Sequence, residues 1–117
     1  MKYMLLIYDN ADTRELFSGA DGKTLGQEID TLMAELTASG ELVGGEALAE
    51  PKQTRSIRGQ NGMPVVTDGP LAEAKEHFGG YLIVECDTPE RATEIAARWP
   101  NARFAAMEVR PIMNAGG

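Results

Sequence analysis

The first strand-forming stretch of the chain is apolar on both of its faces, and this feature constrains the fold most. Two sets of apolar side chains alternate along residues 2–8. One face carries Met4, Leu6 and Tyr8, and the other carries Tyr3, Leu5 and Ile7. Residues 80–86 and 103–110 alternate in a similar way. An antiparallel sheet with helices on one side normally leaves its other side polar. The pattern therefore predicts that something besides the helices covers the second face of this sheet.

A second copy of the same sheet is the economical cover. Two copies packed sheet to sheet would form a homodimer, and two-fold symmetry is the usual form of such assemblies. The alternative is that part of the apolar face is exposed, since folded surfaces are more than half apolar. A patch that crosses three strands is larger than monomers usually expose, so the pattern favours the homodimer.

Turn and cap signals divide the chain into β-α-β, a hairpin, and a second β-α-β. The expected elements are strands at 2–8, 41–48, 80–86 and 103–110, helices at 24–40 and 88–99, and a hairpin of 54–58 and 64–67 around the turn 59–62. A helical turn is expected around 14–17, and residues 71–77 form either a helical turn or an ordered loop. Two such units in 117 residues predict one domain, 1–117, of the α+β class. Its architecture would be a ferredoxin-like antiparallel sheet with both helices on one face.

Composition excludes several classes of function. The net charge of −7 argues against nucleic acid and anionic membranes as partners, because both need a cationic surface. The lone Cys86 excludes an internal disulfide and any multi-cysteine metal site, and it fits a reducing compartment. No targeting segment or membrane span is visible, which predicts a cytoplasmic protein. With a single histidine and no carboxylate cluster at ligand spacing, neither a metal site nor another cofactor is expected.

The densest polar stretch, residues 67–80, is the first candidate for chemistry. Glu73 and His77 are four residues apart and would share one face of a helical turn, where a carboxylate favours the protonated imidazole. From spacing alone, a surface pair that only solvates the turn is favoured. The Asp68-Gly69-Pro70 segment can likewise have a purely structural role, in which Asp68 starts a surface turn that other residues could replace.

The last expected strand is the second candidate. Glu108 and Arg110 alternate with Met107 and Val109, so if the apolar pair meets the helices, the charged pair points into the dimer space. Charges there must be paired or line a wet cleft, and Glu85 is placed to join them. For Glu108 and Arg110, a structural ion pair is favoured over a catalytic role.

Several motifs together resemble the YCII-related superfamily, and most of all its branch named for an Asp-Gly-Pro-Phe motif. The resemblance rests on the segments 1–8, 44–48, 66–76, 79–81 and 107–112, and it covers nearly the whole chain. Leu71 stands where that motif has Phe, which is a conservative apolar exchange. The resemblance implies a dimeric α+β barrel with an active-site cleft near the Asp68 loop.

The resemblance also limits the chemistry that can be carried over. Some members of the superfamily use a His–Asp pair, and the His of that pair lies in the first helix. One group of members is a dehydrochlorinase that acts on a chlorinated hydroxyquinol. Residues 24–40 contain no His, so the pair does not transfer, and His77 is not a positional substitute. Members of the branch are often encoded beside extracytoplasmic-function sigma factors, which implies a sensory or accessory role for some.

Two functional hypotheses and one plain alternative follow. The first is a lyase- or isomerase-like enzyme for a small organic molecule, with Asp68 as the acid or base. Its substrate would be oriented by Tyr81, His77 or Arg110, and Glu73 would be a further contact. The second is a non-catalytic module that binds a small molecule or a protein partner, linked to a sigma factor. The plain alternative is that Asp68 only caps its loop, in which case its loss costs about 1 kcal/mol of stability.

Overall fold

The structure is a computed structural model that describes residues 1–71 and 74–113. A four-stranded antiparallel sheet forms its centre, with the strand order β2-β5-β1-β6. These strands are β1 (Lys2–Asp9), β2 (Leu42–Ala47), β5 (His77–Glu85) and β6 (Ala106–Pro111). Each β-α-β unit is split by a strand of the other unit, as in a ferredoxin-like sheet. The predicted α+β class, the antiparallel sheet and the β-α-β elements are confirmed.

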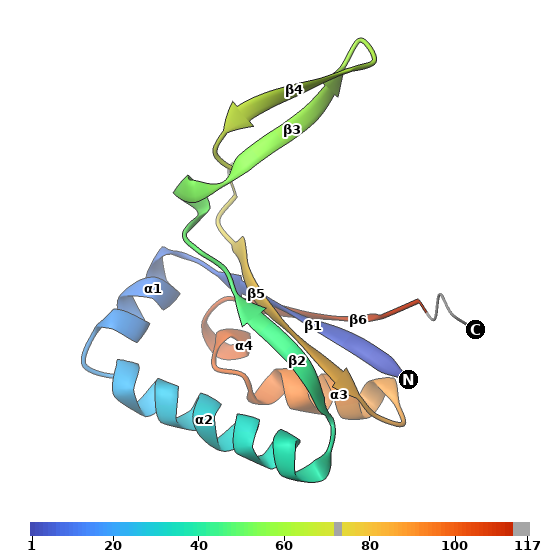
Figure 1. The fold of residues 1–117 in the computed structure, drawn as a ribbon. Coiled ribbons are helices and arrows are strands. Elements are labelled where there is room, and N and C mark those ends of the chain that lie inside the picture. The colour runs from blue at the N-terminus through green and yellow to red at the C-terminus, as the bar shows by residue number, and fades with distance from the viewer. Residues whose placement is uncertain (72–73, 114–117) are drawn as a thin grey trace.

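Four helices lie against one face of this sheet (Figure 1). They are α1 (Ala11–Ser18), α2 (Gly22–Ser39), α3 (Pro89–Arg98) and α4 (Asn101–Phe104). The Thr88 hydroxyl accepts a hydrogen bond from the Arg91 amide at 3.1 Å, which caps α3 as the Thr-Pro pair predicted. No helix in the described part of the chain is both long and apolar enough to cross a membrane.

The core lies between the helices and one set of alternating strand residues. Its buried members are Tyr3, Leu5, Leu82 and Val84 from the strands, Leu32 and Leu36 from α2, Ala92, Ile95 and Ala96 from α3, and Cys86. Met107 and Val109 pack against this cluster, so Glu108 and Arg110 of β6 face the other way, as their alternation predicted.

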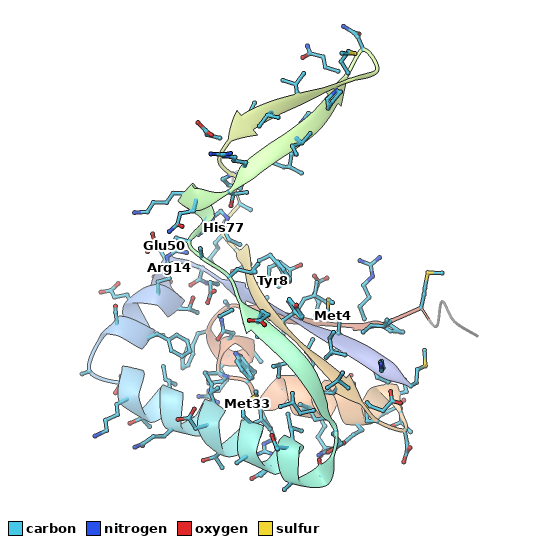
Figure 2. All side chains as sticks on the ribbon, viewed as in Figure 1. Met4, Tyr8, Arg14, Met33, Glu50 and His77 are labelled. Carbon is cyan, nitrogen blue, oxygen red and sulfur yellow. The ribbon has the colours of Figure 1, made fainter. Side chains whose placement is uncertain are left out.

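The other face of the sheet, called the open face below, carries apolar side chains, and no helix of the described residues lies over them (Figures 1 and 2). Its half-buried members include Met4, Leu6, Tyr8, Tyr81 and Ile83. Tyr8 contacts Phe78 edge to face at 5.9 Å between ring centroids, and its hydroxyl lies 2.5 Å from a Glu108 carboxylate oxygen. That hydrogen bond raises the pKa of Tyr8, because it holds the phenol proton against an anionic acceptor.

A second, two-stranded sheet stands away from this body and is called the arm below (Figure 1). It consists of β3 (Arg55–Gln60) and β4 (Met63–Asp68), preceded by the short helix η1 (Pro51–Gln53). Asn61 and Gly62 have φ values of 51° and 79°, which is the left-handed pair that a two-residue hairpin turn requires. The radius of gyration is 16.2 Å, whereas a compact chain of this length has about 13 Å.

The last strand and the segment before β5 differ from expectation. Residues 101–104 form α4, so the strand predicted from 103 begins only at Ala106 and Phe104 is helical. His77, Phe78 and Gly79 belong to β5, and the described residues 74–76 are not helical. The first helix is a full eight residues, and α2 begins at Gly22 instead of Thr24.

Candidate functional site

The structure disperses the candidate residues over three places. Asp68 ends β4 at the base of the arm, opposite Arg55, with an exposed side chain. Tyr81 and Arg110 lie on the open face, opposite Leu6 and Met4 respectively. His77 begins β5 and is half-buried.

Glu73 lies outside the described residues, so its predicted pairing with His77 is not described. The segment around Asp68 is held by its backbone. The Gly69 amide donates to the Thr54 carbonyl at 2.7 Å, and the Ser56 hydroxyl donates to the Gly69 carbonyl at 2.5 Å.

Around His77 the structure forms a small polar cavity, called the junction cavity below, where the arm leaves the body. It has a volume of about 180 Å³, and its charged or titratable lining residues are Asp9, Arg14, Glu50 and His77. Figure 2 shows Arg14, Glu50 and His77 grouped at this corner. A larger cleft of about 570 Å³ adjoins it and shares Glu50 and His77. The arm and the segment after Asp68 supply the far wall of that cleft, including Ile57, Pro70 and Leu71.

Strand pairing brings Asp9 and His77 together. Asp9 ends β1 and His77 begins β5, and the two are directly opposite in the antiparallel register. Opposed residues of such a pair share a face and have Cβ atoms about 5 Å apart. The pairing therefore places Asp9 opposite the only histidine of the chain, and both residues line the junction cavity.

The Asp9 carboxylate is oriented by two buried residues. Its Oδ1 accepts a hydrogen bond from Asn101 Nδ2 at 2.8 Å and lies 3.4 Å from Thr13 Oγ1, whose single proton is shared with the nearer Asn10 carbonyl at 2.9 Å. Asn101 and Thr13 are 2% and 0% exposed, so these donors are held in place by the packing around them. Asn101 Nδ2 also donates to the Tyr8 carbonyl at 2.8 Å. No described residue donates a hydrogen bond to Oδ2, which lies over Gly79.

A reciprocal cap fixes the start of α1 beside Asp9. The Asn10 side chain accepts from the Thr13 amide at 2.8 Å, and the Thr13 hydroxyl accepts from the Asn10 amide at 2.9 Å. Asn10 Nδ2 also donates to Glu76 at 3.3 Å and to the Phe104 carbonyl at 3.2 Å. The start of α1, the segment before β5 and the end of α4 are thus held together around the site.

Sequence reasoning missed Asp9, Asn10, Arg14, Glu50 and Asn101. A signal existed for the first two, because Asp9-Asn10 directly follows an apolar strand and Thr13 lies three residues after Asn10. No spacing rule connects Asn101 to Asp9, which are 92 residues apart.

The chemistry available at the junction cavity is proton transfer and anion binding. An imidazole and an oriented carboxylate are the usual acid–base groups of enzymes, and a guanidinium binds carboxylates with two parallel hydrogen bonds. Among the described residues no group of three or more His, Cys, Asp or Glu side chains is placed to hold a metal ion.

Comparison with known proteins gives one family and one relative. The family described as "YCII-related domain" matches residues 1–115. An uncharacterized protein of Rhizobium meliloti (strain 1021) is 25% identical over 114 residues, which cover 96% of this chain and 92% of the relative.

Proposed function

This chain belongs to the family of YCII-related domains, and from that premise we propose that its junction cavity binds a small organic acid and transfers a proton to or from it. Asp9 and His77 are the acid–base pair, and Arg14 binds the acid's carboxylate. The reaction class would be lyase- or isomerase-like, as expected from the sequence. Asp68, two residues before Pro70 in the wall of the adjoining cleft, is the alternative acid or base.

One observation carries this proposal above the others. Asp9 has one oxygen held by Asn101 and Thr13, and its second oxygen receives no hydrogen bond from the described residues. A carboxylate with one oxygen held by the protein and the other open to water or to a ligand, at a cavity that also contains an imidazole, is what a positioned base requires.

Deuterium exchange tests the chemistry directly. The protein is incubated in D₂O with a panel of small 2-oxo and 2-hydroxy acids, and proton NMR follows loss of the C–H signal next to the carbonyl or hydroxyl. We expect exchange with at least one acid and its loss in both Asp9→Asn and His77→Asn. Asp12→Asn, an exposed carboxylate in α1, is the matched control and should exchange like the wild type. Exchange that survives in both variants but stops in Asp68→Asn would move the base to Asp68.

The second candidate function is a non-catalytic module for a protein partner. The exposed arm favours it, because Ile57, Met63 and Val66 are 65%, 66% and 60% exposed. It predicts that amide signals of the arm shift when an extracytoplasmic-function sigma factor of the same organism is added, and that no acid of the panel exchanges. Shifts at the junction cavity without exchange would instead indicate a binding site without catalysis.

We further propose that the protein is a homodimer, in which the open faces of two copies pack together as a dimeric α+β barrel. The supporting observation is the row of apolar side chains on the open face with no helix over it. Light scattering on a gel-filtration column should give twice the chain mass of 12.6 kDa. Leu6→Glu should shift the mass towards the monomer. Ala38→Glu, an exposed position of α2 on the other side of the sheet, is the control and should stay dimeric.

A further inference from the structure

A groove on the helix side of the sheet has the composition of a ligand site and shares only Asp9 and Gly79 with the lining of the junction cavity. It has a volume of about 380 Å³ and lies between the helices and the strands β2 and β5. Its walls are large apolar side chains, Phe17 from α1, Ile29 and Met33 from α2, and Trp99 after α3. Figure 2 shows Met33 between α2 and the sheet. Gly45, Glu46 and Ala47 of β2, which are exposed, also line it.

The groove exists because glycine and alanine occupy several neighbouring strand positions on this side of the sheet. Its floor is formed by Gly45, Ala47, Gly79 and Gly80. A Cβ at Gly45 would lie 2.5 Å from the Tyr81 carbonyl oxygen, and one at Gly80 would lie 2.8 Å from that of Glu46. These contacts are with backbone, which cannot move aside, so side chains at positions 45 and 80 cannot fill the space. Protein cores are otherwise packed densely, so a floor of this kind below four large side chains is a notable exception.

The charge that faces the groove is negative. Asp9 lines it, whereas Glu46 alternates with Gly45 and Ala47 of the floor, so its side chain lies on the open face, opposite Tyr81. No Lys, Arg or His is among the described lining residues. Asp9 Oδ2, which receives no hydrogen bond from the described residues, lies over Gly79 of the floor. A carboxylate beside apolar surface is stabilised by a cation that hydrogen-bonds to it, and the faces of Trp99 and Phe17 also attract cations.

We propose that this groove binds an organic cation, namely a primary or secondary amine with an apolar body. The ammonium group donates a hydrogen bond to Asp9 Oδ2, and the body packs against Met33 and Trp99 over the glycine floor. Asp9 is shared with the junction cavity, but the two sites have different walls and can be tested separately.

Fluorescence of Trp99 reports binding directly, because it is the only tryptophan of the chain. The probe is 2-cyclohexylethylamine, which does not absorb at the wavelengths used, and the uncharged comparison is 2-cyclohexylethanol. We expect a saturable change with the amine and at least tenfold weaker binding of the alcohol. Asp9→Asn should remove the difference between the two probes. No saturable change with the amine, or equal binding of amine and alcohol to the wild type, would overturn the proposal.

Two further variants separate this site from the junction cavity and from a folding defect. Ala47→Leu fills the floor and should abolish amine binding, whereas Ala38→Leu, an exposed alanine of α2, should not. His77→Asn should leave amine binding unchanged while it stops deuterium exchange. If His77→Asn stops exchange and the wild type binds no amine, the proposed function stands and the amine site does not. Unchanged amine binding in Ala47→Leu would count against the groove even if Asp9→Asn did not fold.

Discussion

At the scale of single residues, Gly79 determines where the Asp9 carboxylate can lie. A Cβ at position 79 would overlap Asp9 Oδ2, whose partner oxygen is fixed by Asn101 and Thr13. The carboxylate can therefore occupy its place only because residue 79 has no side chain. This links a glycine that lies 70 positions downstream in the sequence to the orientation of the candidate base.

Two glycine substitutions should have opposite effects for this reason. Gly79→Ala should lower the free energy of unfolding by about 1 kcal/mol, because the Asp9 side chain must leave its hydrogen bonds. Gly26→Ala is the matched control in the interior of α2, where an added Cβ meets nothing within 4 Å. It should raise stability by about 0.5–1 kcal/mol through helix propensity. Urea denaturation measures both, and a neutral Gly79→Ala would show that Asp9 is not held as described.

Glu41 provides a pH-dependent contribution to stability away from the site. Arg91 donates to both of its carboxylate oxygens at 2.9 Å, and this pairing lowers the pKa of Glu41 from 4.5 to about 2. A carboxyl whose pKa is lowered by folding stabilises the native state above its unfolded pKa, and the contribution disappears as the pH falls through the folded pKa. The sensitive window therefore runs from about pH 4.5 down to about pH 2.

Glu41→Gln should accordingly destabilise the protein by about 1 kcal/mol at pH 7, since a half-exposed pair is weakened by solvent screening. The difference from the wild type should shrink as the pH falls through that window. Glu28→Gln, which removes a more exposed pair with Arg103, should change stability less at every pH. Denaturant titrations at pH 7 and pH 3 measure both variants, and a difference that grows on acidification would contradict the assignment.

At the scale of elements, the sequence predicted those structures whose signals are local. The two-faced strand, the Asn61-Gly62 turn and the Thr88-Pro89 cap each depend on a few neighbouring residues, and each formed where expected. The predicted start of the last strand at residue 103 was wrong. Phe104 and Ala105 continue the two-residue alternation of side chains in β6, although residues 101–104 are helical. The buried Asn101, bonded to Asp9 and Tyr8, explains the preference for a helical turn there, and that contact has no local signal.

The candidate site illustrates the same limit. Local spacing singled out residues 67–80, which include His77, but it gave no sign of Asp9, because strand register and not sequence distance places Asp9 opposite His77. The arm likewise could be recognised as a hairpin, whereas its separation from the body could not. The sequence pattern of residues 55–68 does not predict which surface the hairpin packs against.

The arm should show this separation in its hydrogen exchange. A two-stranded hairpin without further packing is marginally stable in water, so its ladder amides should exchange fast in a monomer. If a second copy covers the arm, protection of residues 55–68 should rise with protein concentration, while amides of β1 and β5 should be protected throughout. Exchange measured at two concentrations on either side of dimer dissociation tests this. Protection that does not depend on concentration would place the arm outside the dimer interface.

At the scale of the whole molecule, charge is distributed unevenly between the arm region and the body. Residues 51–71 contain three Lys or Arg and one Asp, a net charge of +2, in a chain of net charge −7. The remaining residues therefore carry −9. In a homodimer, an arm that lies against the other copy would bring its positive charge to an acidic body, and this attraction would add to the burial of apolar surface.

Reversal of one arm charge should weaken the homodimer if the arm takes part in it. Arg55→Glu replaces an arm cation, and we expect the dimer dissociation constant to rise about tenfold at 50 mM salt, with a smaller effect at 500 mM because salt screens the interaction. Lys23→Glu makes the same change of net charge on α2, away from the arm, and serves as the control. Sedimentation equilibrium measures both. An equal effect of the two variants would mean that the total charge of the chain matters and that the arm does not contact the second copy.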